Sequence, residues 1–213
     1  MFGLFLMLGL LFGSQCPTSA SAASDTIVLE KAPLTFGTDL GTALWARKST
    51  RDFAEREIPL QLLSQILWAG DGVNRENGKR TAPAARAFQF VHIYVLSRSG
   101  NYLFVPSLQQ LKKVNDAELV SKAGIQPYVA SASHVLAFVA NLPEFTSEAP
   151  REQKLTLANL QAGCMAQNVY LALASSGLGG CLVFSTNEQA VEEGLALTAD
   201  QALLFIMPVG YPK

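Results

Sequence analysis

The stretch from Leu155 to Ser176 places the strongest constraint on the fold of this chain. It predicts a helix with large apolar residues along its length and alanine, glycine and cysteine in most other positions. A helix that is apolar around most of its circumference belongs in a protein core or in an obligate interface. Gly177-Leu178-Gly179-Gly180 then predicts the end of the helix.

The other predicted elements alternate between strands and helices. Pattern and end signals predict helices at 39–45, 59–70 and 116–123, and a further helix opened by a Ser185–Glu188 capping box. They predict strands at 88–96, 102–105, 135–139, 181–184 and 202–207, with a hairpin joining the first two. This order predicts an α+β domain with a mixed sheet. We find no internal repeat, and we expect one domain over residues 23–213.

Composition excludes several classes of protein. The 213 residues suit one large domain, and 49% hydrophobic against 15% charged residues excludes a disordered chain. A formal charge of -1 gives no global attraction for nucleic acid. Three cysteines without a CxxC pair predict neither a disulfide framework nor a metal site.

The amino terminus has the features of a signal peptide. Phe2–Phe12 is a nearly unbroken apolar run of 11 residues, too short to span a bilayer, and Ala20-Ser21-Ala22 forms an A-x-A cleavage pattern. We expect residues 1–22 to be removed after export, which places the mature protein in the periplasm. A retained membrane anchor is the alternative, because the basic region that usually precedes such a run is absent.

Positive charge is concentrated in the first half of the chain. Eight of the 16 Lys and Arg residues lie between positions 47 and 86, and none lies between Lys154 and Lys213. Arg47-Lys48-Ser49-Thr50-Arg51 combines cations with hydroxyl groups, which are the donors that phosphate oxygens accept from. A solvated turn between two helices is the alternative. Gly72–Lys79 and Gly177–Gly179 match neither a phosphate loop nor a dinucleotide fingerprint in spacing.

Four segments in order resemble the FMN-dependent nitroreductase family, which includes dehydrogenase-like relatives. Arg47-Lys48-Ser49-Thr50-Arg51-Asp52-Phe53 is similar to the family's R-R-S-x-R-x-F, and Arg80-Thr81-Ala82-Pro83-Ala84-Ala85-Arg86-Ala87 to its R-T-A-P-S-A-R-N. Residues 162–171 with 176–179 resemble its central helix, and Pro208–Pro212 its terminal P-V-G-Y-P. Together they span residues 38–213.

The resemblance implies a fold, a cofactor and a partner. Members fold as an α+β sandwich with a mainly antiparallel sheet flanked by helices. They form homodimers through their long helices, with one FMN in each of two interfacial clefts. Carried over by position, the residues expected to bind FMN are Arg47, Lys48, Ser49, Arg51, Pro83, Ala84, Ala85, Arg86, Ala87, Gly180, Cys181, Leu182 and Lys213.

These residues would have different parts in the site. By the resemblance, the first four hold the phosphate, ribityl chain and pyrimidine edge, residues 83–87 lie along the isoalloxazine, residues 180–182 face N5, and Lys213 adds a phosphate contact. Arg51 and Arg86 are the candidates for the cation that stabilises the reduced flavin. Ala84 and Ala87 replace a Ser and an Asn of the family pattern, which puts the strength of flavin binding in doubt.

The implied activity is that of an oxidoreductase. A flavin carries the chemistry, so no catalytic nucleophile is required. Hydride would pass from a donor such as NAD(P)H through N5 to a nitroaromatic, quinone or similar small acceptor. Two alternatives stay open: a flavin dehydrogenase or oxidase that desaturates its substrate, and a flavin-poor binding or structural dimer. The export signal leaves the electron donor undetermined, because NAD(P)H is cytoplasmic.

Overall fold

The computed structural model describes residues 25–213, so the predicted signal peptide at 1–22 lies outside the described residues. Its strands form one seven-stranded sheet with the order β1-β4-β3-β2-β5-β7-β6. The strands are β1 Thr26–Val28, β2 Val91–Ser97, β3 Gly100–Val105, β4 Gln110–Asn115, β5 His134–Asn141, β6 Gly179–Gly180 and β7 Gln201–Gly210. The helices are α1 Leu40–Ala46, α2 Leu60–Asp71, α3 Arg151–Ser175 and α4 Glu188–Gly194, with 3-10 turns at Ala85–Ala87, Pro127–Ser131 and Leu142–Glu144.

The sheet is antiparallel along all of its strand pairs. The isolated bridge between Ser49 and Gly180 adds one parallel contact. The expected α+β architecture with a mainly antiparallel sheet is therefore confirmed. Within residues 25–213, none of the helices has both the length and the hydropathy needed to cross a membrane.

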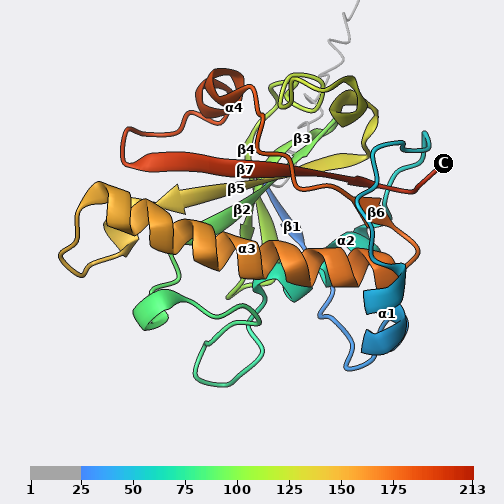
Figure 1. Ribbon diagram of the computed structural model, residues 1–213, viewed down its shortest axis with the longest axis horizontal. Coiled ribbons are helices and arrows are strands. Elements are labelled where there is room, and N and C mark those ends of the chain that lie inside the picture. Colours follow the sequence, from blue (N-terminus) through green and yellow to red (C-terminus); the bar gives the residue numbers. More distant parts are fainter. Residues whose placement is uncertain (1–24) are drawn as a thin grey trace, which may run out of the picture.

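Helices and turns cover both faces of the sheet, and each face has its own core. In Figure 1, α2 and α3 lie on one side of the strands, and α4 with the turns near β3 lies on the other. Side chains of β5 alternate between the two cores: Leu136 and Phe138 face α3, whereas Val135 and Ala137 face the opposite layer. Because both faces are buried, the central strands are apolar at nearly every position, as expected for a doubly covered sheet.

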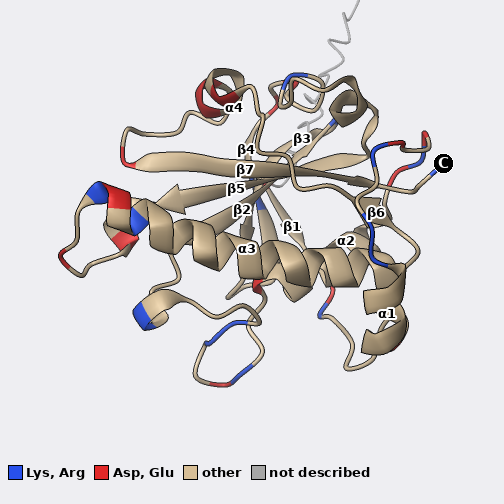
Figure 2. Ribbon diagram, in the orientation of Figure 1, with Lys and Arg blue, Asp and Glu red and all other residues tan. Residues whose placement is uncertain are grey.

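The long apolar helix is confirmed as α3, which starts four residues earlier than expected. Small residues on its inner face, among them Ala158, Ala162 and Ala166, let it pack closely on the sheet. The outer face is open: Leu160 is 64% exposed, and Cys164 is exposed as well. Figure 2 shows that charged residues occur only near its amino-terminal end. The apolar sequence therefore serves a core on one side and leaves an uncharged surface on the other.

Three local predictions were wrong. Residues 116–123 form turns instead of a helix, because the Asn115 carboxamide accepts from Ala117 N–H and Glu118 accepts from Ser121 N–H. The strand expected at 181–184 is reduced to a bridge of Val183 with Ile206, and the regular strand is β6. The capping box is absent, since α4 begins after Asn187 without a side-chain cap.

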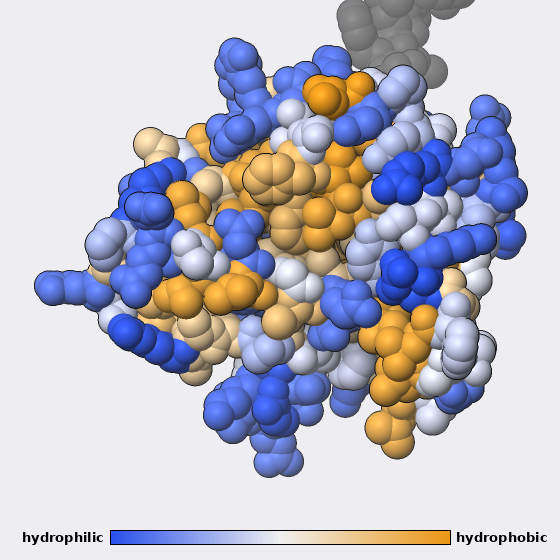
Figure 3. Space-filling view, viewed as in Figure 1, coloured by the Kyte–Doolittle hydropathy of each residue, from blue (hydrophilic) through white to orange (hydrophobic). Residues whose placement is uncertain are grey.

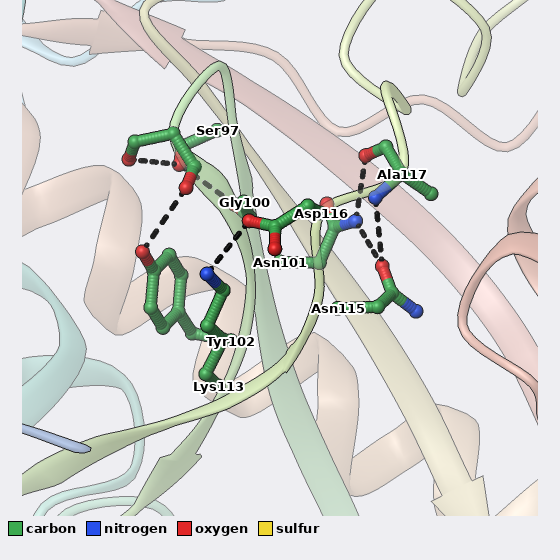
Figure 4. Close-up of polar contacts among 9 residues, drawn as sticks. Ser97, Gly100, Asn101, Tyr102, Lys113, Asn115, Asp116 and Ala117 are labelled. Carbon is green, nitrogen blue, oxygen red and sulfur yellow. Dashed lines mark hydrogen bonds and ion pairs between the residues drawn. The ribbon is translucent and has the colours of Figure 1, made fainter. Parts of the chain in front are cut away.

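Polar side chains join the β2–β3–β4 meander to the chain that follows it (Figure 4). The fully buried Asn101 donates from Nδ2 to Asn115 Oδ1 at 2.7 Å and to the carbonyl oxygen of Ala117 at 2.8 Å. Asn115 in turn donates to the carbonyl oxygen of Gly194 at 2.8 Å. This network therefore connects the meander with the end of α4.

Replacing Asn101 with Ala should lower the free energy of unfolding by about 1–3 kcal/mol, because two partly buried acceptors lose their donor. Urea unfolding followed by circular dichroism measures the change. Asn187→Ala is the matched control, because this exposed asparagine makes no capping bond and its loss should cost less than about 0.5 kcal/mol. Equal effects of the two variants would contradict the role given to the network.

Candidate functional site

The basic segment 47–51 lies against the end of α3 and against β6. Thr50 N–H donates to the carbonyl oxygen of Gly180 at 2.9 Å, next to the parallel bridge between Ser49 and Gly180. Glycine is required beside this contact, because a Cβ atom on Gly179 would lie 2.3 Å from Thr50 Oγ1. The structure therefore brings together two of the segments expected to hold a cofactor.

Tyr170 of α3 connects the same two segments. Its hydroxyl accepts a hydrogen bond from Leu182 N–H at 2.6 Å, and the guanidinium carbon of Arg47 lies 5.4 Å from its ring centroid. Tyr170, Lys48 and Gly180 also line a cavity of about 170 Å³. Tyr170 thus contacts both the Arg47 side chain and the backbone of Leu182, and it lines the cavity between the two segments.

Arg51 lies beside Tyr128 and Cys181. The neighbouring Cys181 and a hydrogen bond with the Tyr128 hydroxyl raise the pKa of Arg51 above its usual value. Arginine is a cation in proteins in any case. Cys181 itself is buried and free. Its thiol packs in the site and is shielded from solvent.

Lys213 reaches the same region through the end of the chain. Its backbone N–H donates to the carbonyl oxygen of Asp52 at 3.2 Å, and its Nζ lies 3.4 Å from Asp52 Oδ1. The carboxylate of Asp52 thus holds the ammonium group that was expected to contact a phosphate.

The backbone of residues 180–182 is less available than expected. Cys181 N–H donates to the carbonyl oxygen of Pro208, and Val183 N–H donates to that of Ile206, at 3.3 and 2.8 Å. Leu182 N–H is taken by Tyr170. A contact between these amides and a flavin would therefore require Leu182 to exchange its present partner, whereas its half-exposed side chain is accessible as it stands.

Residues 83–87 lie far from this cluster within one protomer. In Figure 1 the short turn of η1, Ala85–Ala87, lies below the amino-terminal half of α3, whereas the 47–51 segment lies beside its other end. Arg86 donates from Nη1 to Ser147 Oγ at 2.7 Å. Pro83 and Ala84 line a separate cavity together with Ala87. The expected site residues therefore form two groups.

The backbone is strained at the second group. Arg86 and Ala87 have φ values of 52° and 64°, in the left-handed region that glycine and asparagine adopt most readily. Such strain persists only where surrounding structure enforces it, and it is frequent at functional sites. The family pattern has Asn at the position of Ala87, so this departure also has a conformational cost.

Comparisons with known proteins identify the family. A family model described as the nitroreductase family matches residues 44–211. A Methanocaldococcus jannaschii protein named as a nitroreductase is 31% identical over 181 residues, which is 80% of this chain and 90% of the relative. A nitroreductase-named crystal structure from Ralstonia eutropha is 34% identical with a TM-score of 0.83, covering 90% of this chain and 92% of that one.

A solved flavin enzyme is also similar. The NADPH:FMN oxidoreductase of Vibrio harveyi, complexed with NAD+, is 26% identical with a TM-score of 0.62, over 82% of this chain and 69% of that one. The chain belongs to the nitroreductase family, and its fold is the one expected from the resemblance. These matches support a flavin-dependent oxidoreductase.

Two residues of the first group were not predicted from the sequence. Tyr170 interrupts a run of small and aliphatic residues in the helix, which was a usable signal. Tyr128 lies in the 3-10 turn Pro127–Ser131, in a segment without periodicity, and only the fold brings it to Arg51.

Substituting Ala87→Asn should raise the free energy of unfolding by about 0.5–1 kcal/mol, because asparagine tolerates the left-handed conformation better than alanine. Ala84→Asn is the control, since Ala84 has a φ of −133° and gains nothing from the change. Thermal or urea unfolding of both variants measures the difference. A gain at position 84 that equals the gain at 87 would argue against backbone strain as the cause.

Proposed function

We propose that this protein binds FMN and uses it to reduce a nitroaromatic, a quinone or a similar small acceptor. The observation that carries the proposal is the donor set of the basic segment: the cations of Arg47, Lys48 and Arg51 and the hydroxyl of Ser49 lie on five consecutive residues. The backbone of this segment is hydrogen-bonded to Gly180 through Thr50. Among residues 25–213, none of these three cations has an acidic ion-pair partner. Such cations suit a phosphate and the oxygens of a pyrimidine edge.

Bound FMN would accept hydride from a donor such as NAD(P)H and pass it to the acceptor. The chain supplies position and charge. Arg51 holds a fixed positive charge beside Tyr128, and Tyr170 holds Arg47 and the backbone at Leu182. Oriented charges of this kind stabilise an anion that forms during a reaction, because they need no reorganisation.

A second copy of the chain would complete the site. The two groups of expected residues lie apart in one protomer, and α3 presents an uncharged, partly apolar outer face between them (Figure 3). Pairing two copies through this face would cover apolar surface and could bring residues 83–87 of one copy to the basic segment of the other. We include export by residues 1–22 in the proposal, on the basis of the apolar run and its cleavage pattern.

The FMN proposal is tested by the visible absorbance spectrum of the purified protein after incubation with FMN and desalting. We expect retained flavin near one per subunit. Arg51→Ala should weaken flavin affinity about tenfold, because a charge-assisted contact is lost. Arg56→Ala is the control, as its guanidinium stacks 3.9 Å from the Tyr211 ring centroid. A parent protein that retains no flavin would refute the proposal.

The dimer is tested by Gly163→Arg. Gly163 lies on the outer face of α3, and a Cβ atom there would meet nothing within 4 Å, so one protomer tolerates the change. We expect the variant to sediment as a monomer in analytical ultracentrifugation and to lose flavin. Leu108→Arg, in the exposed turn between β3 and β4, should remain dimeric. A dimeric Gly163→Arg variant would place the interface elsewhere.

A further inference from the structure

A cavity of about 570 Å³ lies outside both groups of expected flavin residues. Its wall is formed by the loop 54–57, which follows the basic segment, by the turn Pro127–Ser131 and Ser133, and by Arg98 between β2 and β3. The volume is within the range of small-molecule sites. None of residues 47–51 or 83–87 lines this cavity, so the proposed flavin chemistry assigns it no ligand.

Four charged side chains of both signs line this cavity. Glu55, Arg56 and Glu57 are consecutive on the loop, where Figure 2 shows neighbouring acidic and basic segments close to the carboxyl terminus, and Arg98 adds a second cation. Within residues 25–213, none of the four takes part in an ion pair. The cavity therefore has two carboxylates and two guanidinium groups that are not neutralised by direct pairing.

Two of these charges, from different elements, act on the same histidine. Burial lowers the pKa of His134 to about 4, Glu57 opposes this shift and Arg98 adds to it. Glu57 and Arg98 therefore both lie near one imidazole, although in the described part of the chain they form no ion pair with each other. A ligand in the cavity would thus have a carboxylate and a guanidinium group within its reach at the same time.

The loop that carries three of the charges is attached at both ends. Ala54 N–H donates to the carbonyl oxygen of Tyr211 at 2.8 Å. Ile58 N–H donates to Oγ of the buried Ser133 at 3.0 Å. The backbone under Glu55 and Glu57 is therefore held in place, which reduces the entropy that a ligand must overcome to order it.

Both cations are oriented by protein contacts as well. The guanidinium carbon of Arg56 lies 3.9 Å from the Tyr211 ring centroid. Arg98 donates from Nη1 to the carbonyl oxygen of Ala132 at 3.2 Å and from Nη2 to that of Ala130 at 3.3 Å. A guanidinium group has five N–H donors, so each arginine keeps donors for a ligand.

We infer that this cavity binds a small zwitterion, namely an α-amino acid or a short peptide with a free ammonium group and a free carboxylate. A ligand with a single charge would lie near protein charges of the same sign as well as the opposite sign, and the two effects oppose each other. A zwitterion places its carboxylate on arginine N–H donors and its ammonium group on Glu55 or Glu57, in charge-assisted hydrogen bonds. No flavin contact enters this inference, so it is independent of the proposed function.

Isothermal titration calorimetry of the purified protein with L-alanyl-L-alanine tests the inference. We expect binding of the dipeptide. We expect roughly tenfold weaker binding of N-acetyl-L-alanyl-L-alanine, which lacks the ammonium group, and of L-alanyl-L-alanine amide, which lacks the carboxylate.

Two double variants locate the binding site. Glu55→Gln combined with Glu57→Gln changes exposed side chains only, and it should weaken dipeptide binding roughly tenfold and remove most of the difference between the dipeptide and its N-acetyl form. Glu76→Gln combined with Glu152→Gln removes the same charge at exposed positions that do not line the cavity. This control should keep the parental affinity.

The outcomes decide the inference without reference to flavin. Binding that the control variant retains and the Glu55 and Glu57 variant loses would support it. Equal affinity for the dipeptide and its two blocked forms would overturn it, and so would undiminished binding by the Glu55 and Glu57 variant. An absence of heat together with an unchanged unfolding temperature in millimolar dipeptide would also overturn it, because a ligand of the folded state raises that temperature.

Discussion

The close packing of α3 on the sheet is the constraint on which the rest of the structure depends. Alanines on its inner face bring the helix near enough for Met165 and Val169 to join the core. Gly70 of α2 contributes to the same contact, since a Cβ atom there would lie 2.9 Å from Val169 Cγ2. This packing fixes the helix axis. It therefore also fixes where the carboxyl end of α3 and the glycine turn after it lie against β7.

That position determines where the donors proposed to bind a phosphate lie. The basic segment is attached to β6 through Thr50 and to the chain terminus through Ala54, whose N–H donates to the carbonyl oxygen of Tyr211 at 2.8 Å. Phe53, fully buried, anchors the segment in the second core. The backbone that carries the cations is therefore hydrogen-bonded on both sides, although Lys48 and Arg51 have exposed side chains. Preorganisation of this kind reduces the entropy lost on binding a ligand.

Hydrophobic periodicity predicted the elements that bury a regular apolar face or run in the core. It located α2, α3, β5 and β7. Asp39 caps α1, with its carboxylate accepting from Thr42 N–H at 3.0 Å. The sequence analysis missed β4, because its two consecutive lysines interrupt the alternation of apolar and polar residues. The turns at 116–123 form through side-chain bonds from Asn115 and Glu118, which no helical or strand period encodes. The motif segments were located by resemblance, and their separation into two groups required the fold.

Positive charge in one protomer is divided between two regions, the basic segment 47–51 and residues 75–86. A single phosphate needs the cations of one segment only, and the middle of α3 between the two regions carries no charge. Burial raises the pKa of Asp71 to about 7, even though Arg80 opposes the rise. The buried carboxyl group therefore costs free energy, and its ion pair orients Arg80. Strain at Arg86 and Ala87 adds to that cost in the same place. Both costs lie in the region that, in the proposed dimer, would meet the basic segment of the second copy and complete the flavin site.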